Sequence, residues 1–385
     1  MQPVENFYFH LFKPEYRIGA AFIIAFILNA YAIPVILRVA KANKLLAIPN
    51  KRTSHSIAVP TLGGLGIYFS IVIVSLTFIN TSGLNGGGIT SSLTSLPSII
   101  AGFTLIFFVG MKDDLLNMPA WKKLIAELIT LFILIVIGDI RLTSLQGMFG
   151  IGELNYFVSL ILSMFAGIVI INAFNLIDGV DGLASSITML GCIVFGSYFL
   201  ETEEWEFAVL SFTMLGALIP FFIYNTFGTK NKIFMGDTGS LILGFAMTVL
   251  VFRFNEMNSM FSGKLHFIAG PAFSFAVLIV PMFDTLRVFA IRIYRGGSPL
   301  KADRRHIHHL LVDLGFTHLQ TTLILIIINM MFIAVAYFFN FLGNSGLVFI
   351  MILIAIFMSV MAMWKYRRKV ALQKRVNMIK ELSLV

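Results

Sequence analysis

Charge is scarce in this sequence. Lysine, arginine, aspartate and glutamate together make up 12% of its 385 residues, about half of the roughly 25% that is usual in a soluble domain. Hydrophobic residues make up 58%, and the mean hydropathy is +0.90. A chain with so few charges cannot cover itself with a solvated surface, so the composition indicates that lipid surrounds most of it.

Cysteine is almost absent as well. The single cysteine, Cys192, excludes an internal disulfide, and its apolar neighbours indicate an inert buried thiol. The sequence also lacks a cysteine cluster of the kind that binds zinc, a lipidation motif and any low-complexity tract.

Long apolar runs take the place of the missing charge. About 20 apolar residues span a bilayer as a helix, and runs of this length recur along the chain. We expect an all-α integral membrane protein, a polytopic bundle of about eleven transmembrane helices that forms one domain over residues 1–385, with a basic tail at 365–385. The expected helices cover residues 17–40, 63–80, 97–111, 121–138, 154–174, 183–200, 206–224, 240–254, 266–291, 319–341 and 345–364.

Basic residues gather in alternate connecting segments. Most of the 28 lysines and arginines lie within residues 41–52, 112–123, 230–232, 292–305 and 365–380. The intervening connections include a Ser/Gly-rich stretch (TSGLNGGGITSSLTS) and an acidic turn (ETEEWE). By the positive-inside rule the basic set is cytoplasmic, which places the N-terminus outside and the C-terminus inside. The basic segments also suit anionic lipids or phosphorylated substrates.

The stretch NAFNLIDGVDGLA, residues 172–184, is unusually polar for the end of an apolar run. It places Asn172, Asn175, Asp178 and Asp181 at intervals of three, and a glycine follows each aspartate. We expect the helix to break near Asp178, so that the second carboxylate turns back toward the first. A simple cap of the next helix is an alternative that accounts for one aspartate but not for the whole set.

Two further polar segments lie on the same predicted side. In PNKRTSHSIAVPTLGGLG, residues 49–66, a basic loop leads into three glycines, which we expect to let the backbone approach a ligand closely. Asp113 and Asp114 stand side by side after the third helix, near Lys122 and Lys123. Adjacent carboxylates repel each other, so a lysine or a divalent cation should lie beside them. An ordinary solvated loop is the alternative.

The last two segments combine carboxylates or histidines with helix starts. In NTFGTKNKIFMGDTGS, residues 225–240, Asp237 opens a new helix, where it could cap the helix or hold an anion near its N-terminus. In PLKADRRHIHHLL, residues 299–311, three histidines follow two arginines. This spacing lacks the partners of a usual zinc site, so phosphate binding is the more natural interpretation.

Five aspartates therefore occupy one predicted membrane face, interleaved with lysine, arginine and histidine. Carboxylates suit Mg²⁺ or Mn²⁺, which often bridge to substrate phosphates. The combination predicts metal-assisted phosphoryl transfer with a lipid as one substrate. A transporter of nucleotide-sugars or other phosphorylated anions is the main alternative, although no internal repeat is evident. An idle lipid-binding scaffold would not need the clustered carboxylates.

Four ordered motifs, NAFNLIDGVDGLA, IFMGDTGSL, the KDD pair and RRHIHH, resemble those of the polyprenyl-phosphate N-acetylhexosamine-1-phosphate transferases over roughly residues 45–311. H-I-H-H favours the WecA-like branch over the MraY-like branch. The resemblance implies transfer of N-acetylhexosamine-1-phosphate, most simply GlcNAc-1-phosphate, from a UDP-sugar to undecaprenyl phosphate with Mg²⁺ or Mn²⁺. The products are undecaprenyl-diphosphate-sugar and UMP.

The resemblance also implies a setting. It places the protein in the bacterial cytoplasmic membrane with its active site on the cytoplasmic face, where it starts a cell-envelope polysaccharide such as O-antigen. The partners it implies are UDP-N-acetylhexosamine, undecaprenyl phosphate and membrane lipids, without nucleic acid; a homodimer is left open. Which sugar and which polymer are also left open.

Site residues follow from the resemblance position by position. Asp237 would be the leading metal ligand, with Asp178 beside the metal or the diphosphate. Asp113 and Asp114 would serve the lipid phosphate, Asp113 as the candidate base, with Lys123 as a helper. Glu127 stands where the family often has glutamine. The implied substrate-binding residues are Asn50, Lys51, Arg52, His55, Asn172, Asn175, Val180, Asp181, Asn225, Phe234 (stacked on uracil), Arg304, Arg305, His306, His308 and His309.

The acceptor in that reaction needs little help from a base. A phosphate with a second pKa of about 6 is mostly ionised at neutral pH. We therefore expect direct in-line attack on the β-phosphorus rather than proton removal by Asp113. Double displacement through a phosphorylated Asp113 or Asp114 is the competing scheme.

Overall fold

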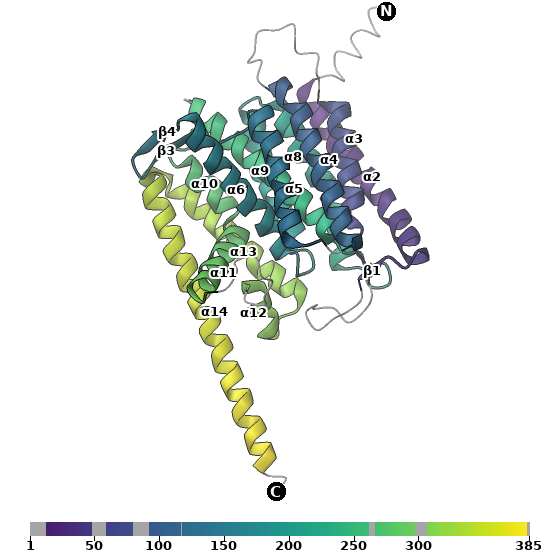
Figure 1. Ribbon diagram of the computed structural model, residues 1–385, viewed down its shortest axis with the longest axis vertical. Helices are drawn as coiled ribbons and strands as arrows, with labels where there is room; N and C mark the ends of the chain where they lie inside the picture. The colour runs from purple at the N-terminus through teal and green to yellow at the C-terminus, as the bar shows by residue number, and fades with distance from the viewer. Residues whose placement is uncertain are drawn as a thin grey trace, which may run out of the picture.

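The computed structural model describes residues 13–47, 59–79, 92–116, 118–261, 266–296 and 306–382. Helices dominate this part of the chain, and the predicted all-α class is confirmed (Figure 1). The elements are α2 Pro14–Ala42, α3 Gly63–Phe78, α4 Ser92–Leu116, α5 Ala120–Phe132, the π-helix η2 Ile133–Ile137, α6 Tyr156–Ile177, α7 Leu183–Glu201, α8 Trp205–Thr226, α9 Gly236–Met260, α10 Gly270–Val277, α11 Ile279–Tyr294, α12 Ile307–Asp313, α13 His318–Phe338, the 3₁₀ turn η3 Asn340–Leu342 and α14 Gly343–Leu382, with the short strands β1 Leu46–Ala47, β2 Val59–Pro60, β3 Ser144–Met148 and β4 Ile151–Glu153.

Each of the eleven expected ranges overlaps helical structure, and the range 266–291 is the one that contains two α-helices instead of one. Among the described residues, eight helices are long and apolar enough to cross a membrane, or nine if the bent pair α10–α11 is one span. The helix α3 is apolar but has 16 residues, about 24 Å of length against a hydrocarbon core of about 30 Å. The long apolar helices confirm a multi-pass membrane protein.

Helix α9 forms the centre of the bundle. It packs against α3, α4, α6 and α7, and its side chains from Thr238 to Phe254 are buried. Glycines allow this close packing. A Cβ on Gly64 of α3 would lie 2.3 Å from the Gly239 nitrogen, and one on Gly110 of α4 would lie 2.5 Å from the Thr238 Cα. Backbones therefore meet directly around the first turn of α9, which fixes the position of Asp237.

The expected helix over residues 266–291 is wrong as a single element. The structure has two helices there, α10 and α11, which are bent by 86° relative to each other. Pro281 has no N–H to donate to the Val277 carbonyl, so the helical ladder is interrupted. Asn329 of α13 satisfies the backbone groups at the break: its Nδ2 donates to that carbonyl at 2.9 Å, and its Oδ1 accepts from the Val280 N–H at 3.3 Å. The break directs α11 toward α12.

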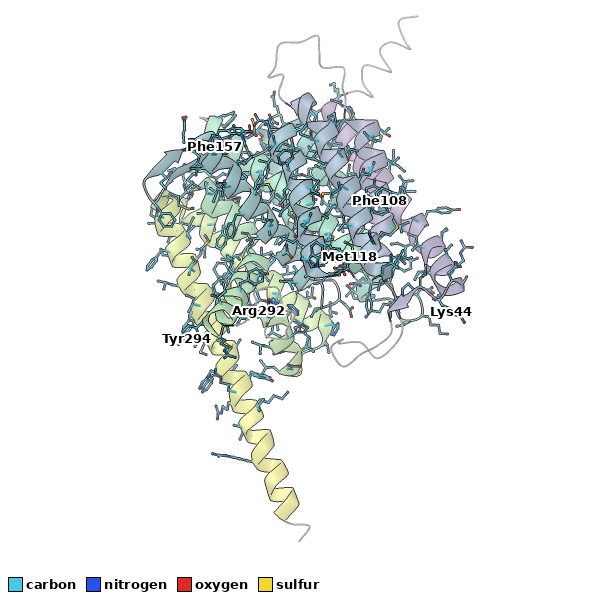
Figure 2. All side chains as sticks on the ribbon, in the orientation of Figure 1. Lys44, Phe108, Met118, Phe157, Arg292 and Tyr294 are labelled. Atoms are coloured by element: carbon cyan, nitrogen blue, oxygen red, sulfur yellow. The ribbon has the colours of Figure 1, made fainter. Side chains whose placement is uncertain are left out.

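The polar motifs collect at one end of the bundle. Figure 2 shows Lys44, Met118 and Arg292 toward this end and Phe157 at the opposite one. The opposite end carries the hairpin β3–β4, which the sequence did not predict. Helix α2 begins at that opposite end, whereas α14 projects beyond the end with the polar motifs (Figure 1). The basic tail is the helical continuation of α14 as far as Leu382.

Candidate active site

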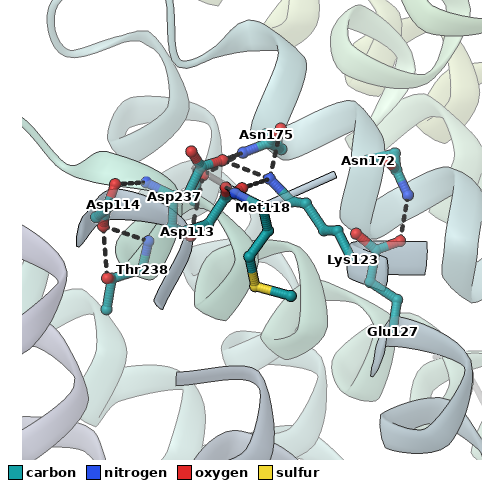
Figure 3. A network of polar contacts seen from close by, with 10 residues as sticks. Asp113, Asp114, Met118, Lys123, Glu127, Asn172, Asn175, Asp237 and Thr238 are labelled. Atoms are coloured by element: carbon teal, nitrogen blue, oxygen red, sulfur yellow. Dashed lines mark hydrogen bonds and ion pairs between the residues drawn. The ribbon is translucent and has the colours of Figure 1, made fainter. Parts of the chain in front are cut away.

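Most of the predicted site residues lie at this end, where α4 ends, α5 and α9 begin, and α6 turns into α7. The structure places Asp113, Asp114, Lys123, Asn175 and Asp237 in one network of polar contacts (Figure 3). Six predicted residues lie outside the described part of the chain: Asn50, Lys51, Arg52, His55, Arg304 and Arg305.

Lys123, in the first turn of α5, is the hub of the network. Its Nζ lies 3.1 Å from Asp113 Oδ2, 2.5 Å from Asp237 Oδ1 and 3.4 Å from Asn175 Oδ1. Its side chain is 13% exposed. One mostly buried ammonium therefore joins α4, α6 and α9, and it is the positive partner that was expected beside Asp113.

Asp113 has both carboxylate oxygens occupied. Oδ1 accepts the Met118 N–H at 2.7 Å, and Oδ2 pairs with Lys123. The Met118 contact also closes the turn between α4 and α5. These two contacts hold the Asp113 carboxylate between the α4–α5 turn and the Lys123 ammonium.

Asp114 caps the first turn of α9 from the neighbouring helix. Oδ1 accepts the Asp237 N–H at 2.8 Å, while Oδ2 accepts the Thr238 N–H at 2.9 Å and the Thr238 hydroxyl at 2.6 Å. A carboxylate at a helix N-terminus satisfies donors that the helix itself leaves open. The prediction considered Asp237 as the cap of this helix, but Asp114 does that work and leaves the Asp237 side chain facing the network.

Asp178 follows α6 directly, and the predicted helix break is confirmed. The pKa of its carboxyl lies well above the ordinary value, because it is desolvated and because Asp237, Asp114 and Asp181 repel its charge. Within the described residues no hydrogen bond reaches this carboxylate. No group of three or more His, Cys, Asp or Glu in the described part of the chain is compact enough for a metal site. The donor set nevertheless fits a divalent cation, because Asp178 and Asp237 offer repelling oxygens that such an ion would neutralise.

Asn225 joins the two halves of the predicted nucleotide site. Its Oδ1 accepts the Gly182 N–H at 2.6 Å, and its Nδ2 donates to the Ile233 carbonyl at 2.8 Å. Gly182 has φ +77° and a Cβ there would lie 2.5 Å from Thr226 Oγ1, so the turn needs glycine. The turn after Asp178 and the segment before Asp237 are thus one unit. Its members Val180 and Phe234 are buried and partly buried.

Asp181 has two partners that sequence reasoning missed. Its Oδ2 lies 2.5 Å from Lys232 Nζ and 2.9 Å from His318 Nδ1. Burial would raise the pKa of Asp181, but the hydrogen bonds from His318 and Lys232 outweigh burial and lower it. The only signal in the sequence for either partner was the basic character of residues 230–232. Lys232 also lies 5.5 Å from the Phe234 ring.

Asn172 faces α5 rather than the network around Lys123. Its Nδ2 donates to Glu127 Oε2 at 2.6 Å and to the carbonyl of Ile168 at 3.0 Å. Glu127 is 1% exposed, one helical turn after Lys123. The pair links α5 to α6 beneath Lys123, so a contact of Asn172 with substrate stays a prediction.

Three glycines at the start of α3 pack closely against protein, and their approach to a ligand stays a prediction. Besides the Gly64–Gly239 contact, a Cβ on Gly63 would lie 2.6 Å from the Phe234 carbonyl oxygen, and one on Gly66 would lie 2.2 Å from Asn29 Oδ1. Their small size serves the packing of α3 against α2 and α9.

The three histidines come together beside the turn after α6. His306 and His308 are 2% and 1% exposed, and the ring centroids of His308 and His309 are 4.2 Å apart. Burial, then His309, lowers the pKa of His308 well below its ordinary value. A Cβ on Gly179 would lie 3.2 Å from His308 Nε2. The histidines therefore adjoin the Asp178 turn.

Comparisons with known proteins agree with this arrangement. The pattern of the family described as glycosyl transferase family 4 matches residues 96–255. The undecaprenyl-phosphate alpha-N-acetylglucosaminyl 1-phosphate transferase of Escherichia coli (strain K12) is 29% identical over 290 residues, 74% of this chain and 73% of the relative. The decaprenyl-phosphate N-acetylglucosaminephosphotransferase of Mycolicibacterium smegmatis is 30% identical over 295 residues, 73% of this chain and 71% of the relative.

The chain belongs to the polyprenyl-phosphate N-acetylhexosamine-1-phosphate transferases. The family match in this transferase runs from α4 to α9 and contains the whole network around Lys123. The histidines follow the match, on α12 and the residue before it.

Proposed function

We propose that this transferase moves GlcNAc-1-phosphate from UDP-GlcNAc to undecaprenyl phosphate, with UMP as the second product. The acceptor is the one that the name of the Escherichia coli relative carries, and N-acetylglucosamine is in the names of both relatives. The single observation that supports this most is the position of Lys123. It joins the Asp113 side of the site, proposed for the lipid phosphate, to Asp237 on the nucleotide side.

Asp237 and Asp178 would hold a divalent cation, Mg²⁺ or Mn²⁺. Such an ion would neutralise diphosphate charge and stabilise the leaving UMP. Asp114 keeps Asp237 in place by capping α9, and Asn175 donates to both Asp237 and Ser240. The residues around the carboxylates thus hold them at the start of α9, where the N–H groups of the helix favour negative charge.

The chemical step is a direct displacement. An oxygen of the acceptor phosphate forms a bond to the β-phosphorus of UDP-GlcNAc, and the bond from that phosphorus to the bridging oxygen breaks, so that UMP leaves with the electron pair. Two anions must approach each other for this reaction, and Lys123 lowers that repulsion. Asp113 orients Lys123, because one Asp113 oxygen is held by the Met118 N–H and the other contacts the Lys123 ammonium.

Apolar surface leads to the Asp113 side of the site. A groove lined by α4 and the start of η2 runs from Pro97 past Phe108 to Lys112 and Met118. Phe108 is 61% exposed, so the groove faces outward from the bundle. Apolar walls that end at a lysine suit a substrate with a hydrocarbon chain and a phosphate.

The site lies at one end of the helices, as an enzyme with one soluble substrate requires. Transporter sites lie near the middle of the membrane instead. We place this end on the cytoplasmic face of the bacterial inner membrane, since the basic residues flank it. There the product would start a cell-envelope polysaccharide.

Purified protein in detergent, given radiolabelled UDP-GlcNAc, Mg²⁺ and undecaprenyl phosphate, should produce lipid-extractable label and UMP in equal amounts. Parallel reactions with UDP-GalNAc and UDP-glucose would define the sugar. Lipid-extractable label without any UMP, or no product from any of the three sugars, would contradict the proposal.

A further inference from the structure

Asp284 is a buried carboxylate for which the proposed reaction has so far given no role. It lies in α11, shortly after the break that separates α11 from α10, and is 2% exposed. Its Oδ2 lies 3.1 Å from His306 Nδ1, and its two oxygens accept the Ile307 N–H at 3.1 and 3.0 Å. Arg287 donates to Oδ1 at 2.8 Å. Burying a charge is costly unless it is paired. The partners of this carboxylate are groups at the start of α12 and an arginine one turn further along α11.

These contacts determine which histidine nitrogens are available. A carboxylate accepts hydrogen bonds, so the proton of His306 at this contact lies on Nδ1. The other ring nitrogen, Nε2, is left free. In both His306 and His308 the Nε2 atom is buried and has no hydrogen-bond partner among the described residues. A buried polar atom without a partner is unfavourable, and a phosphate oxygen can be that partner where the ring nitrogen carries a proton.

One of these two nitrogens lies beside the turn that carries Asp178. His308 Nε2 lies 3.2 Å from the position that a Cβ would take on Gly179, next to Asp178. The His306 and His308 rings are nearly parallel, with 14° between their planes and 5.5 Å between their centroids. The anchor at Ile307 lies between the two histidines, so Asp284 controls the placement of both rings.

We propose that Asp284 is a positioning residue that holds the His306–His308 pair with its Nε2 atoms toward the β-phosphate of the UDP-sugar. The proposal rests on the proposed function, because it assumes a nucleoside diphosphate at this site. Asp284 does not touch substrate. An imidazole that donates to Asp284 through Nδ1 can donate to a phosphate oxygen through Nε2 when the ring carries both protons.

The test compares the affinities of UDP and UMP, which differ by the β-phosphate. Isothermal titration with Mg²⁺ present would measure both nucleotides on the wild-type protein, Asp284→Asn and His308→Ala. In Asp284→Asn an amide NH₂ replaces one carboxylate oxygen and faces groups that donate hydrogen bonds themselves. The variant therefore loses the contacts that anchor the start of α12 to α11. We expect UDP to bind about tenfold more weakly, as for one lost charge-assisted hydrogen bond, while UMP affinity changes less than twofold.

A double variant separates positioning from general damage. If Asp284 acts through the histidines, Asp284→Asn combined with His308→Ala should bind UDP no more than twofold more weakly than His308→Ala alone. The proposal would be overturned if the double variant lost UDP affinity by the product of the two single losses. It would also be overturned if Asp284→Asn weakened UDP and UMP binding equally. Asn344→Ala is the control, because this buried residue holds the β3–β4 hairpin through the Gln146 carbonyl at the other end of the bundle.

Folding and function can be checked in the same experiment. If Asp284→Asn does not fold, Asp284→Glu keeps the charge while displacing it, and it should show the same selective loss for UDP; an unchanged ratio of the two affinities would contradict the proposal. A wild-type protein that binds neither nucleotide would refute the proposed function itself. Wild-type binding with an unchanged UDP-to-UMP ratio in Asp284→Asn would refute only the role of Asp284.

Discussion

Replacing Lys123 with methionine keeps most of the volume of the side chain and removes its charge. The ammonium contacts Asp113 at 3.1 Å and Asp237 at 2.5 Å, and the side chains are 13%, 13% and 34% exposed. A hydrogen bond to a charged group contributes about 1.5–3 kcal/mol. Because Asp237 is one third exposed, we discount its share for solvent screening. The loss then comes to about 3–4 kcal/mol, which is about a 10²- to 10³-fold fall in transfer rate.

The assay for this variant is the initial rate of lipid-extractable label from UDP-GlcNAc at saturating substrates. Lys122→Met is the matched control, because Lys122 is exposed and lies over the Trp121 ring at 5.4 Å. It should keep more than half of the wild-type rate. A Lys123→Met enzyme with more than a tenth of the wild-type rate would refute the view that this ammonium joins the two halves of the site.

Three other predictions follow from the same geometry. Asp113→Asn should keep measurable transfer activity, since Asp113 orients Lys123; a complete loss together with a trapped phospho-aspartate in the wild type would favour double displacement. Gly64→Ala should lower the melting temperature in detergent, because its Cβ would lie 2.3 Å from a backbone nitrogen, whereas Gly152→Ala, with open space around it, should not; equal shifts would disprove the tight packing. Asp181 has a lowered pKa, so its pairing contributes stability in full above its ordinary pKa of about 4 and loses it as the pH falls from there through the lowered pKa. Asp181→Asn should therefore destabilise the protein at pH 7 and less at pH 3, as thermal melts would show; equal destabilisation at both would contradict this.

Hydropathy located the long apolar helices, because a run of apolar residues has few alternatives in a bilayer, but it did not predict α12. The same signal concealed the break between α10 and α11, since hydropathy continues across it and only Pro281 marked the interruption. The break depends on the hydrogen bonds from Asn329 of α13, and no local sequence pattern near the break contains that contact. Asp284 was missed for a related reason, because a lone carboxylate within an apolar run carries no motif.

The site was predicted where chemistry and spacing coincide. The aspartates of 113–114, 178 and 237 converge as expected, but their division of labour depended on contacts between helices. Asp114 proved to be the cap of α9, and this could not be read from a sequence in which 123 residues separate it from Asp237. The glycines of α3 looked suited to a ligand, yet they meet α2 and α9, because small residues serve backbone packing and ligand approach equally well.

Exchange of radiolabelled UMP into UDP-GlcNAc tests the central claim most directly. Direct transfer predicts exchange only when undecaprenyl phosphate and Mg²⁺ are both present, and its loss when the cation is removed with EDTA. Exchange that proceeds at the same rate without the lipid would contradict direct attack by the acceptor phosphate. Absence of exchange under every condition would contradict the transferase function itself.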